Sequence, residues 1–119
     1  MIIGMDWFNT ITQQPEVFAA FSKILKADGH TILVITAGRG DPQEYASRVE
    51  RSLKEIGFEF DKIIAVPFEQ ASEIPELKLQ DCLENKVDIY FDDRGDVIEC
   101  LRAAGIKAVQ VKKKRGPQF

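Results

Sequence analysis

The chain has 119 residues, 45% of them hydrophobic and 29% charged, with 16 Lys and Arg against 19 Asp and Glu. This length fits one domain with a core of its own and excludes two. The net charge of −3 argues against a dedicated nucleic-acid binder. No run approaches the roughly 18 apolar residues of a membrane span, so no membrane partner is expected. The first residues have no basic signal-peptide region, which makes the cytoplasm the expected location.

Buried strands and amphipathic helices alternate along the sequence. Strands are recognised as short apolar or β-branched runs, and helices by apolar residues that recur at helical spacing. In chain order the predicted elements are strand 2–5, helix 14–28, strand 31–36, helix 42–56, strand 62–66, helix 76–86, strand 87–91, helix 96–104 and strand 107–111. Residues 68–75 show no period and are predicted to be irregular.

Local signals mark where several of these helices begin. Asp41, Pro42 and Glu44 have the pattern of an N-cap, a first-turn proline and the acidic half of a capping box. Asp96 is predicted to be the N-cap of the fourth helix. The third helix has the weakest period, and its apolar residues are Leu77, Leu79 and Leu83.

Five strands that alternate with helices predict an α/β, three-layer Rossmann-like fold. Its five-stranded parallel sheet would have helices on both faces, in one domain over residues 1–111. Residues 112–119 are predicted to be a basic C-terminal tail, either a solvated end or a local contact to a phosphate backbone. In such folds the carboxyl ends of the strands lie at one edge of the sheet, and ligands bind there.

Three carboxylates follow the ends of two predicted strands. Asp6 comes after the first strand, and Asp92 and Asp93 come after the fourth. Their negative charges repel one another unless a cation lies among them, and hard carboxylate oxygens suit Mg²⁺. The sequence therefore predicts a magnesium site. The plain alternative is that these are ordinary turn and capping residues.

Groups suited to binding a phosphate accompany this acidic cluster. Thr36 ends the second strand, and the main-chain amides of Ala37, Gly38 and the two residues that follow could form an anion-holding turn. Lys78, in the third helix, could add a compact positive charge. The alternatives are a turn residue for Thr36 and a solvated helix surface for Lys78.

The order of these groups resembles the haloacid dehalogenase (HAD-like) superfamily of phosphotransferases and hydrolases. The resemblance runs from Ile2 to Val111, and four motifs carry it: Met5-Asp6-Trp7-Phe8-Asn9-Thr10-Ile11, Ile35-Thr36, Lys78 and Tyr90-Phe91-Asp92-Asp93. It implies the strand order fifth-fourth-first-second-third, which would bring Asp6 beside Asp92 and Asp93.

The resemblance also implies an activity, that of a Mg²⁺-dependent phosphatase acting on a phosphorylated small molecule or macromolecule. Asp6 would be the nucleophile that becomes an aspartyl phosphate. Thr36 and Lys78 would hold the phosphoryl oxygens and take part in catalysis, and Thr10 would brace the loop. The implied metal ligands are Asp6, the main-chain carbonyl of Phe8, Asp92 and Asp93.

The sequence departs from this family pattern at Phe8. Most phosphatases of the family carry there an Asp that is the general acid and base, and phenylalanine cannot transfer a proton. One alternative is therefore a HAD-like binding or regulatory domain that is catalytically weak or inactive. Another is a metal-independent hydrolase, because an aromatic residue at this position is similar to the dehalogenases of the family.

The segments between strands leave no room for a cap domain over the site. Only one helix fits between Asn9 and Thr31, and only a loop and a short helix fit between Val66 and Val87. A capless site suits a macromolecular substrate, a lid supplied by a partner, or a homo-oligomer. Residues 35–41 also resemble a loop of polynucleotide phosphatases, which keeps nucleic acid among the alternatives.

Overall fold

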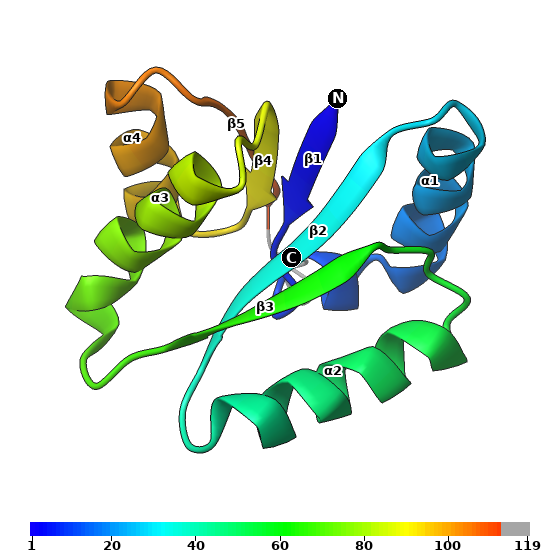
Figure 1. Ribbon diagram of the computed structural model, residues 1–119, viewed down its shortest axis with the longest axis horizontal. Coiled ribbons are helices and arrows are strands. Elements are labelled where there is room, and N and C mark those ends of the chain that lie inside the picture. The colour runs from blue at the N-terminus through cyan, green and yellow to red at the C-terminus, as the bar shows by residue number, and fades with distance from the viewer. Residues whose placement is uncertain (113–119) are drawn as a thin grey trace, which may run out of the picture.

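Strands and helices alternate along residues 1–112, the part of the chain that the computed structural model describes (Figure 1). The strands are β1 (Ile2–Met5), β2 (Thr31–Gly38), β3 (Lys62–Pro67), β4 (Ile89–Asp92) and β5 (Lys107–Gln110). The helices are η1 (Ile11–Gln13), α1 (Pro15–Ala27), α2 (Pro42–Glu55), η2 (Ala71–Glu73), α3 (Ile74–Glu84) and α4 (Gly95–Ala103). Of the predicted tail, all but Lys112 lies outside the described residues. None of the described helices is long and apolar enough to cross a membrane.

The five strands form one parallel sheet in the order β3-β2-β1-β4-β5. This confirms the predicted α/β, Rossmann-like arrangement, and the strand order is the expected one read from the other edge. The central strand is β1, in which Ile3 pairs with Ile32 of β2 and with Ile89 of β4. The residues that follow β1 and β4 are therefore neighbours.

Helices cover both faces of the sheet, α1 and α2 on one and α3 and α4 on the other (Figure 1). Successive strand residues point to opposite faces, so each face has its own core. Met5 and Val34 pack with residues of α1 and α2 such as Phe18 and Leu53. Leu33, Ile35 and Tyr90 pack with residues of α3 and α4 such as Cys82 and Leu101.

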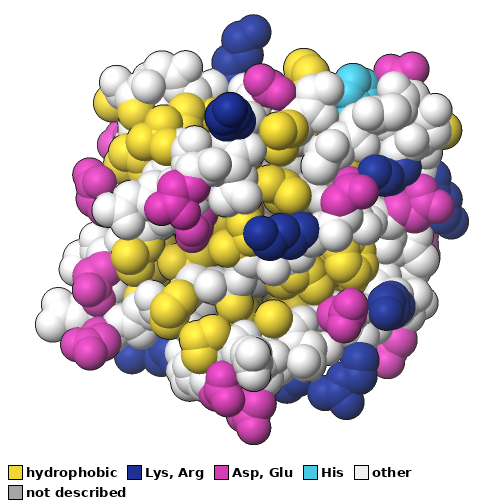
Figure 2. Space-filling model, viewed as in Figure 1, with side chains coloured by type: hydrophobic (Ala, Val, Ile, Leu, Met, Phe, Trp, Pro, Cys, Tyr) yellow, Lys and Arg dark blue, Asp and Glu magenta, His cyan; other side chains and the backbone are white. Residues whose placement is uncertain are grey.

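Some apolar surface remains uncovered. Figure 2 shows hydrophobic side chains across the middle of one face, in the region where the edge strand β3 crosses the same view in Figure 1, with charged side chains around them. Ile63 and Ile64 of β3 are only half-buried.

The N-terminus of α2 agrees with the sequence in part. The Asp41 carboxylate accepts a hydrogen bond from the Gln43 amide at 2.9 Å, and Pro42 takes the first helical position. The predicted partner in a capping box, Glu44, is exposed in the first turn, and the box does not form. A capping box does form before α3, where Glu73 accepts a hydrogen bond from the Gln70 amide.

The third helix differs most from prediction. It begins at Ile74 rather than at residue 76, and η2 occupies part of the segment expected to be irregular. Its buried residues are Ile74, Lys78 and Cys82, whereas Leu83 is 56% exposed. These three lie four residues apart, on one face of the helix. Leu77 and Leu79 pack half-buried against the core as an amphipathic helix requires, but the fully buried stripe has a lysine as its middle member and does not follow from the apolar residues.

Two boundaries near the predicted site also differ. α4 begins at Gly95 with Arg94 at its N-cap, so Asp96 lies in the first turn instead of capping the helix. The Asp92 carboxylate accepts the Arg94 amide at 3.0 Å and closes the turn before α4. β2 continues past its predicted end at residue 36 to Gly38, because Ala37 and Gly38 still pair with β3.

Candidate active site

Three carboxylates meet where β1 and β4 end. Asp6 follows β1, Asp92 is the last residue of β4, and Asp93 comes next. The Asp6 amide donates to the Phe91 carbonyl at 2.9 Å, which continues the pairing of the two strands. One carboxylate oxygen from each residue lies within 4.8 Å of the others. The structure therefore brings together the three acidic residues that the sequence singled out.

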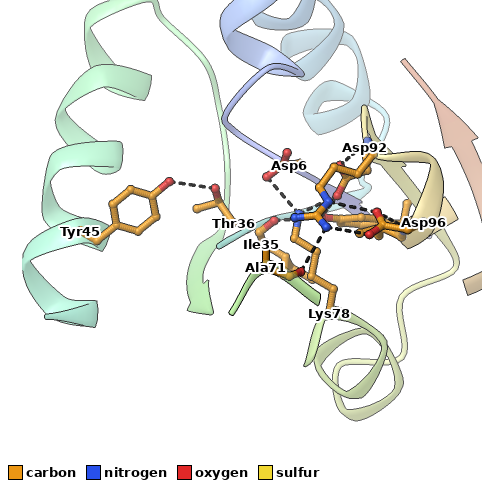
Figure 3. A network of polar contacts seen from close by, with 11 residues as sticks. Asp6, Ile35, Thr36, Tyr45, Ala71, Lys78, Asp92 and Asp96 are labelled. Atoms are coloured by element: carbon orange, nitrogen blue, oxygen red, sulfur yellow. Dashed lines mark hydrogen bonds and ion pairs between the residues drawn. The ribbon is translucent and has the colours of Figure 1, made fainter. Parts of the chain in front are cut away.

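Lys78 reaches these carboxylates from α3. Its ammonium lies 2.6 Å from Oδ2 of Asp92 and 3.2 Å from Oδ1 of Asp6, and Figure 3 shows the lysine and Asp6 pointing toward each other. Asp92 also accepts a hydrogen bond from the Tyr90 hydroxyl at 3.0 Å. All four side chains are buried. The alternative of a solvated lysine is therefore excluded.

Burial decides the electrostatics of this cluster. The pKa of Asp6 is raised from 3.8 to about 7, chiefly because burial removes solvent from the carboxylate; the ammonium of Lys78 opposes this rise, and the charges of Asp92 and Asp93 add to it. Burial disfavours the charged form of Lys78 too, but the neighbouring carboxylates outweigh it and its pKa rises above the usual value. A single ammonium thus faces three carboxylates.

The donor set fits a divalent cation. With Lys78 charged, three ionised carboxylates outnumber the single ammonium that is buried beside them. Hard oxygen ligands of this kind are those that Mg²⁺ takes in proteins, commonly from one or two carboxylates plus waters and substrate phosphates. The main-chain carbonyl of Phe8, beside the same cleft, would be a further oxygen of this type.

Thr36 lies at the same edge of the sheet, with its side chain fully buried. Its hydroxyl is 3.1 Å from the hydroxyl of Tyr45 on α2 (Figure 3), and it is not among the residues that line the cleft. A threonine hydroxyl can accept from one partner and donate to another. If Tyr45 donates, the hydroxyl of Thr36 keeps one proton that it can donate to a second acceptor.

The two residues after Thr36 do not form the predicted anion-holding turn. Ala37 pairs with Val66 and Gly38 with Pro67, so both belong to β2. Ala37 lines the cleft. Gly38 lies against Tyr45, where an added Cβ would come within 2.4 Å of the ring. Pairing with β3 extends the strand, which leaves the turn to the residues that follow.

The loop after β1 is braced differently from the expectation. The Asn9 amide donates to Oγ1 of Thr12 at 2.9 Å. Thr10 is fully buried, and its hydroxyl finds no hydrogen-bond partner within residues 1–112. Asn9 adopts a left-handed conformation with φ of 60°, which asparagine tolerates better than most residues. Thr12, not Thr10, therefore holds this turn.

The carboxylates open into a cleft of about 490 Å³. Its walls come from the segments that follow β1, β2, β3 and β4 and from the start of α3. The lining residues are Asp6, Phe8, Asn9, Ala37, Arg39, Phe68, Ala71, Ile74, Lys78, Asp93 and Arg94. Phe8 is 62% exposed although it lies only two residues from Asp6. The cleft therefore combines a charged floor with aromatic and cationic walls.

Sequence reasoning missed several residues of this site. Tyr90 belongs to one of the four motifs, but the motif gives it no role; alternation along β4 would have placed it on the same face as Asp92, to which it donates a hydrogen bond. Tyr45 lies on the side of α2 that packs on the sheet, and its contact with Thr36 has no local signal in the sequence. Arg39 and Arg94 stand beside motif residues, but their contacts depend on segments far away in the sequence.

Comparison with known proteins gives structural likeness only. No protein-family model matches the chain, and no curated protein matches its sequence. A chain in the structure of the Pnkp1/Rnl/Hen1 RNA repair complex superposes with a TM-score of 0.71 at 17% identity, over 94% of this chain and 42% of that chain. A second structure of the Pnkp1/Rnl/Hen1 complex gives 0.71 and 17%, over 97% and 47%.

A universal stress protein in complex with cAMP matches over almost the whole length of both chains. Its TM-score is 0.62 at 12% identity, with 96% of this chain and 98% of that chain covered. The chain spans less than half the length of the Pnkp1/Rnl/Hen1 chains. These superpositions establish the Rossmann-like α/β fold. At sequence identities this low they show the fold alone, so the activity must be argued from the site.

Proposed function

We propose that the protein is a Mg²⁺-dependent phosphohydrolase of the HAD-like superfamily that works through an aspartyl phosphate on Asp6. One observation carries the proposal: buried Asp6 lies beside Asp92, Asp93 and Lys78 at the carboxyl edge of a parallel sheet. Ligands of such folds bind at this edge. The strand order supports the resemblance in motifs, since it makes Asp6 and Asp92 neighbours.

The reaction would run in two displacements on phosphorus. An Asp6 carboxylate oxygen attacks the phosphorus, the bond to the leaving oxygen breaks, and that oxygen keeps the electron pair and takes a proton from water. A second water then attacks the phosphorus, and the bond between the phosphorus and the Asp6 oxygen breaks. The attacking water gives its proton to the hydroxide left by the first step, so that phosphate and the free carboxylate are released. Lys78 and Thr36 would donate to the phosphoryl oxygens. Bound magnesium would supply a Lewis acid that offsets the phosphoryl charge.

Ionised Asp6 is the form that attacks. Because the pKa of Asp6 is about 7, its carboxyl group is protonated in a large fraction of the protein molecules at neutral pH when no metal ion is bound. A divalent cation beside the carboxylate favours the charged form. Magnesium would thus have a second role, that of keeping the nucleophile ionised in a site where burial opposes ionisation.

Phe8 favours a second candidate function. A general acid or base at the leaving group is worth about 10²–10⁴ in rate, and the phenyl ring two residues after Asp6 supplies neither. The same site would then bind magnesium or phosphate without turnover, as a binding or regulatory domain. Repeated release of phosphate separates the two candidates.

The openness of the cleft bears on the substrate. η1 and α1 connect β1 to β2, and η2 and α3 connect β3 to β4, so the described chain has no insertion large enough for a cap. An uncapped site favours a phosphorylated macromolecule over a small metabolite that must be enclosed. The likeness to chains of an RNA repair complex supports a nucleic-acid end as one such substrate.

The test is phosphate release from small phosphomonoesters and from phosphorylated oligonucleotides, with Mg²⁺ and with EDTA. Turnover that requires Mg²⁺ and is lost in Asp6→Asn supports the phosphohydrolase, and Asp28→Asn, at an exposed position, is the matched control. Turnover that survives EDTA would instead indicate the metal-independent hydrolase. Magnesium binding in a calorimeter with no turnover on any substrate would favour the binding domain.

A further inference from the structure

The mouth of the cleft carries aromatic and cationic groups that phosphate chemistry does not require. Phe8 lines the cleft with most of its ring in solvent. The guanidinium of Arg39 lies 4.9 Å from the centre of the Phe68 ring, and both residues line the same cleft. The guanidinium also donates to the Glu69 carbonyl at 3.1 Å. This hydrogen bond fixes the arginine over the ring.

We propose that these groups bind a nucleotide, whose base stacks on Phe8 or on the Arg39–Phe68 pair while its phosphate faces Asp6. The inference rests on the proposed function, because the phosphate of this nucleotide is the group presented for transfer. A planar guanidinium and exposed aromatic rings are the surfaces on which bases stack, independently of their sequence.

The strand order sets these groups around the nucleophile. Arg39 and Phe68 follow β2 and β3, on one side of β1, and Arg94 follows β4, on the other. Arg94 is held by Asp96 at 2.6 Å and by the Ala71 carbonyl at 3.1 Å. The two arginines thus follow strands on opposite sides of β1, and Phe8 and Phe68 line the same cleft.

This charge pattern selects a nucleotide over other aromatic phosphates. Arg39 donates to a neutral carbonyl, so that bond does not offset its positive charge. A phosphotyrosyl peptide offers a ring and a single phosphate. A nucleic-acid end offers a base, a terminal phosphate that faces Asp6 and a second phosphate that Arg39 can bind, whereas the charge of Arg94 is already offset by Asp96.

The experiment compares substrates that differ only in the base. Oligonucleotides with a 5′- or a 3′-phosphate are paired with the same oligonucleotides carrying an abasic terminal residue, and a free nucleoside monophosphate is paired with ribose 5-phosphate. The wild-type protein with Mg²⁺ is expected to prefer the member with a base by about 10-fold or more in kcat/KM, given the usual strength of base stacking. The free and oligonucleotide arms tell whether a nucleic-acid chain is required.

Variants at residue 8 test whether the ring reads the base. Phe8→Leu keeps an apolar side chain without a π-face and is expected to reduce the preference for the base by about 10-fold, whereas Phe8→Tyr keeps it. Arg39→Gln is expected to weaken the dependence of the oligonucleotide KM on salt. Leu83→Ala, at an exposed position of α3 outside the cleft, is the control for a general effect of losing surface apolar area.

Binding of the same ligands, measured by fluorescence anisotropy, separates this inference from the proposed function. Preferential binding of the base-bearing end without turnover would uphold nucleotide recognition and overturn the phosphohydrolase. Turnover with equal kcat/KM for base-bearing and abasic ends would uphold the phosphohydrolase and overturn nucleotide recognition. A higher kcat/KM for a phosphotyrosyl peptide than for every nucleotide would also overturn the inference.

Discussion

The ammonium of Lys78 lies 2.6 Å from a carboxylate oxygen of Asp92, and the two side chains are only 2% and 0% exposed. Each charge of such a buried pair needs its partner. Removal of one partner leaves an uncompensated buried charge, which costs far more free energy than replacement of both partners by apolar residues. Tyr90 supplies a further donor to the same oxygen of Asp92. Stability and the proposed phosphate chemistry therefore depend on the same lysine.

Replacing Lys78 by methionine should lower the free energy of unfolding by about 3–5 kcal/mol, because two buried carboxylates lose their counter-charge. Urea denaturation measures the loss. Saturating Mg²⁺ should restore part of it, since the cation can take over the role of the ammonium. Lys54→Met is the control: its pair with Glu50 is exposed, at 3.6 Å, and its loss should cost less than about 0.5 kcal/mol. Equal effects of the two variants would contradict the ion-pair argument.

Phe8→Asp should restore a proton donor at the mouth of the cleft. Hydrolysis of alkyl phosphates should become about 10²–10⁴ faster, because an alkoxide leaves poorly without a proton. The gain should be smaller for p-nitrophenyl phosphate, whose leaving group is a stable anion. Phe8→Asn is the matched control, of nearly the same size as Asp but without the acid. If Asn accelerates as much as Asp, removal of the ring, and not proton transfer, explains the change.

The hydroxyls of Thr36 and Tyr45, 3.1 Å apart, should be coupled. A double-mutant cycle of Thr36→Val and Tyr45→Phe in urea is expected to give a coupling of about 1 kcal/mol, the net value of a neutral hydrogen bond. If Thr36 also donates to the substrate, Thr36→Val should weaken the binding of inorganic phosphate more than Tyr45→Phe does. A coupling near zero would mean that the two hydroxyls are satisfied separately.

The carboxylate of Asp61 should make stability depend on pH. Partial burial opposes its ionisation, but hydrogen bonds from Lys26 and the Ile32 amide, with the charge of Lys26, outweigh burial and hold its pKa below the ordinary 3.8. A depressed pKa gives stability that is present above about pH 4 and is lost as the pH falls through the lower folded-state value.

Asp61→Asn should therefore lower the free energy of unfolding by about 1 kcal/mol at pH 7, a modest value because solvent screens a side chain that is 38% exposed. Urea titrations from pH 7 downward should show the wild-type protein and the variant converging below pH 4. The exposed Glu50→Gln serves as the reference for surface carboxylates. A difference that stays constant down to pH 2 would show that the packing of Asp61, not its charge, matters.

The sequence allowed prediction of the fold and the acidic cluster because both follow from short-range patterns. Alternating strands and helices imply a parallel sheet, and a parallel sheet brings the ends of its strands to one edge. Asp6 and Asp92 therefore meet although 85 residues separate them. The resemblance in motifs added the strand order.

What escaped prediction depends on contacts between distant segments. Lys78 can be buried only because Asp6 after β1 and Asp92 of β4 pair with it. A pattern of apolar residues therefore could not identify the face of α3 that carries Lys78 as the buried one. The extension of β2 to Gly38 depends on pairing with β3. The hydroxyl pair of Thr36 and Tyr45 requires α2 to pack back on the sheet. None of these contacts can be inferred from the residue or from its neighbours in the sequence.

The central position of β1 has a consequence for how the protein forms during synthesis. β1 is the earliest of the five strands to leave the ribosome, yet one of its two neighbours, β4, begins only at Ile89. Until then one edge of β1 has unpaired main-chain groups, which nascent chains expose at some risk of pairing with another chain. Asp6 likewise stays without Asp92 and Lys78 for most of translation. A nascent or truncated chain that stops before β4 would therefore carry Asp6, the proposed nucleophile, without the charges that surround it in the folded domain.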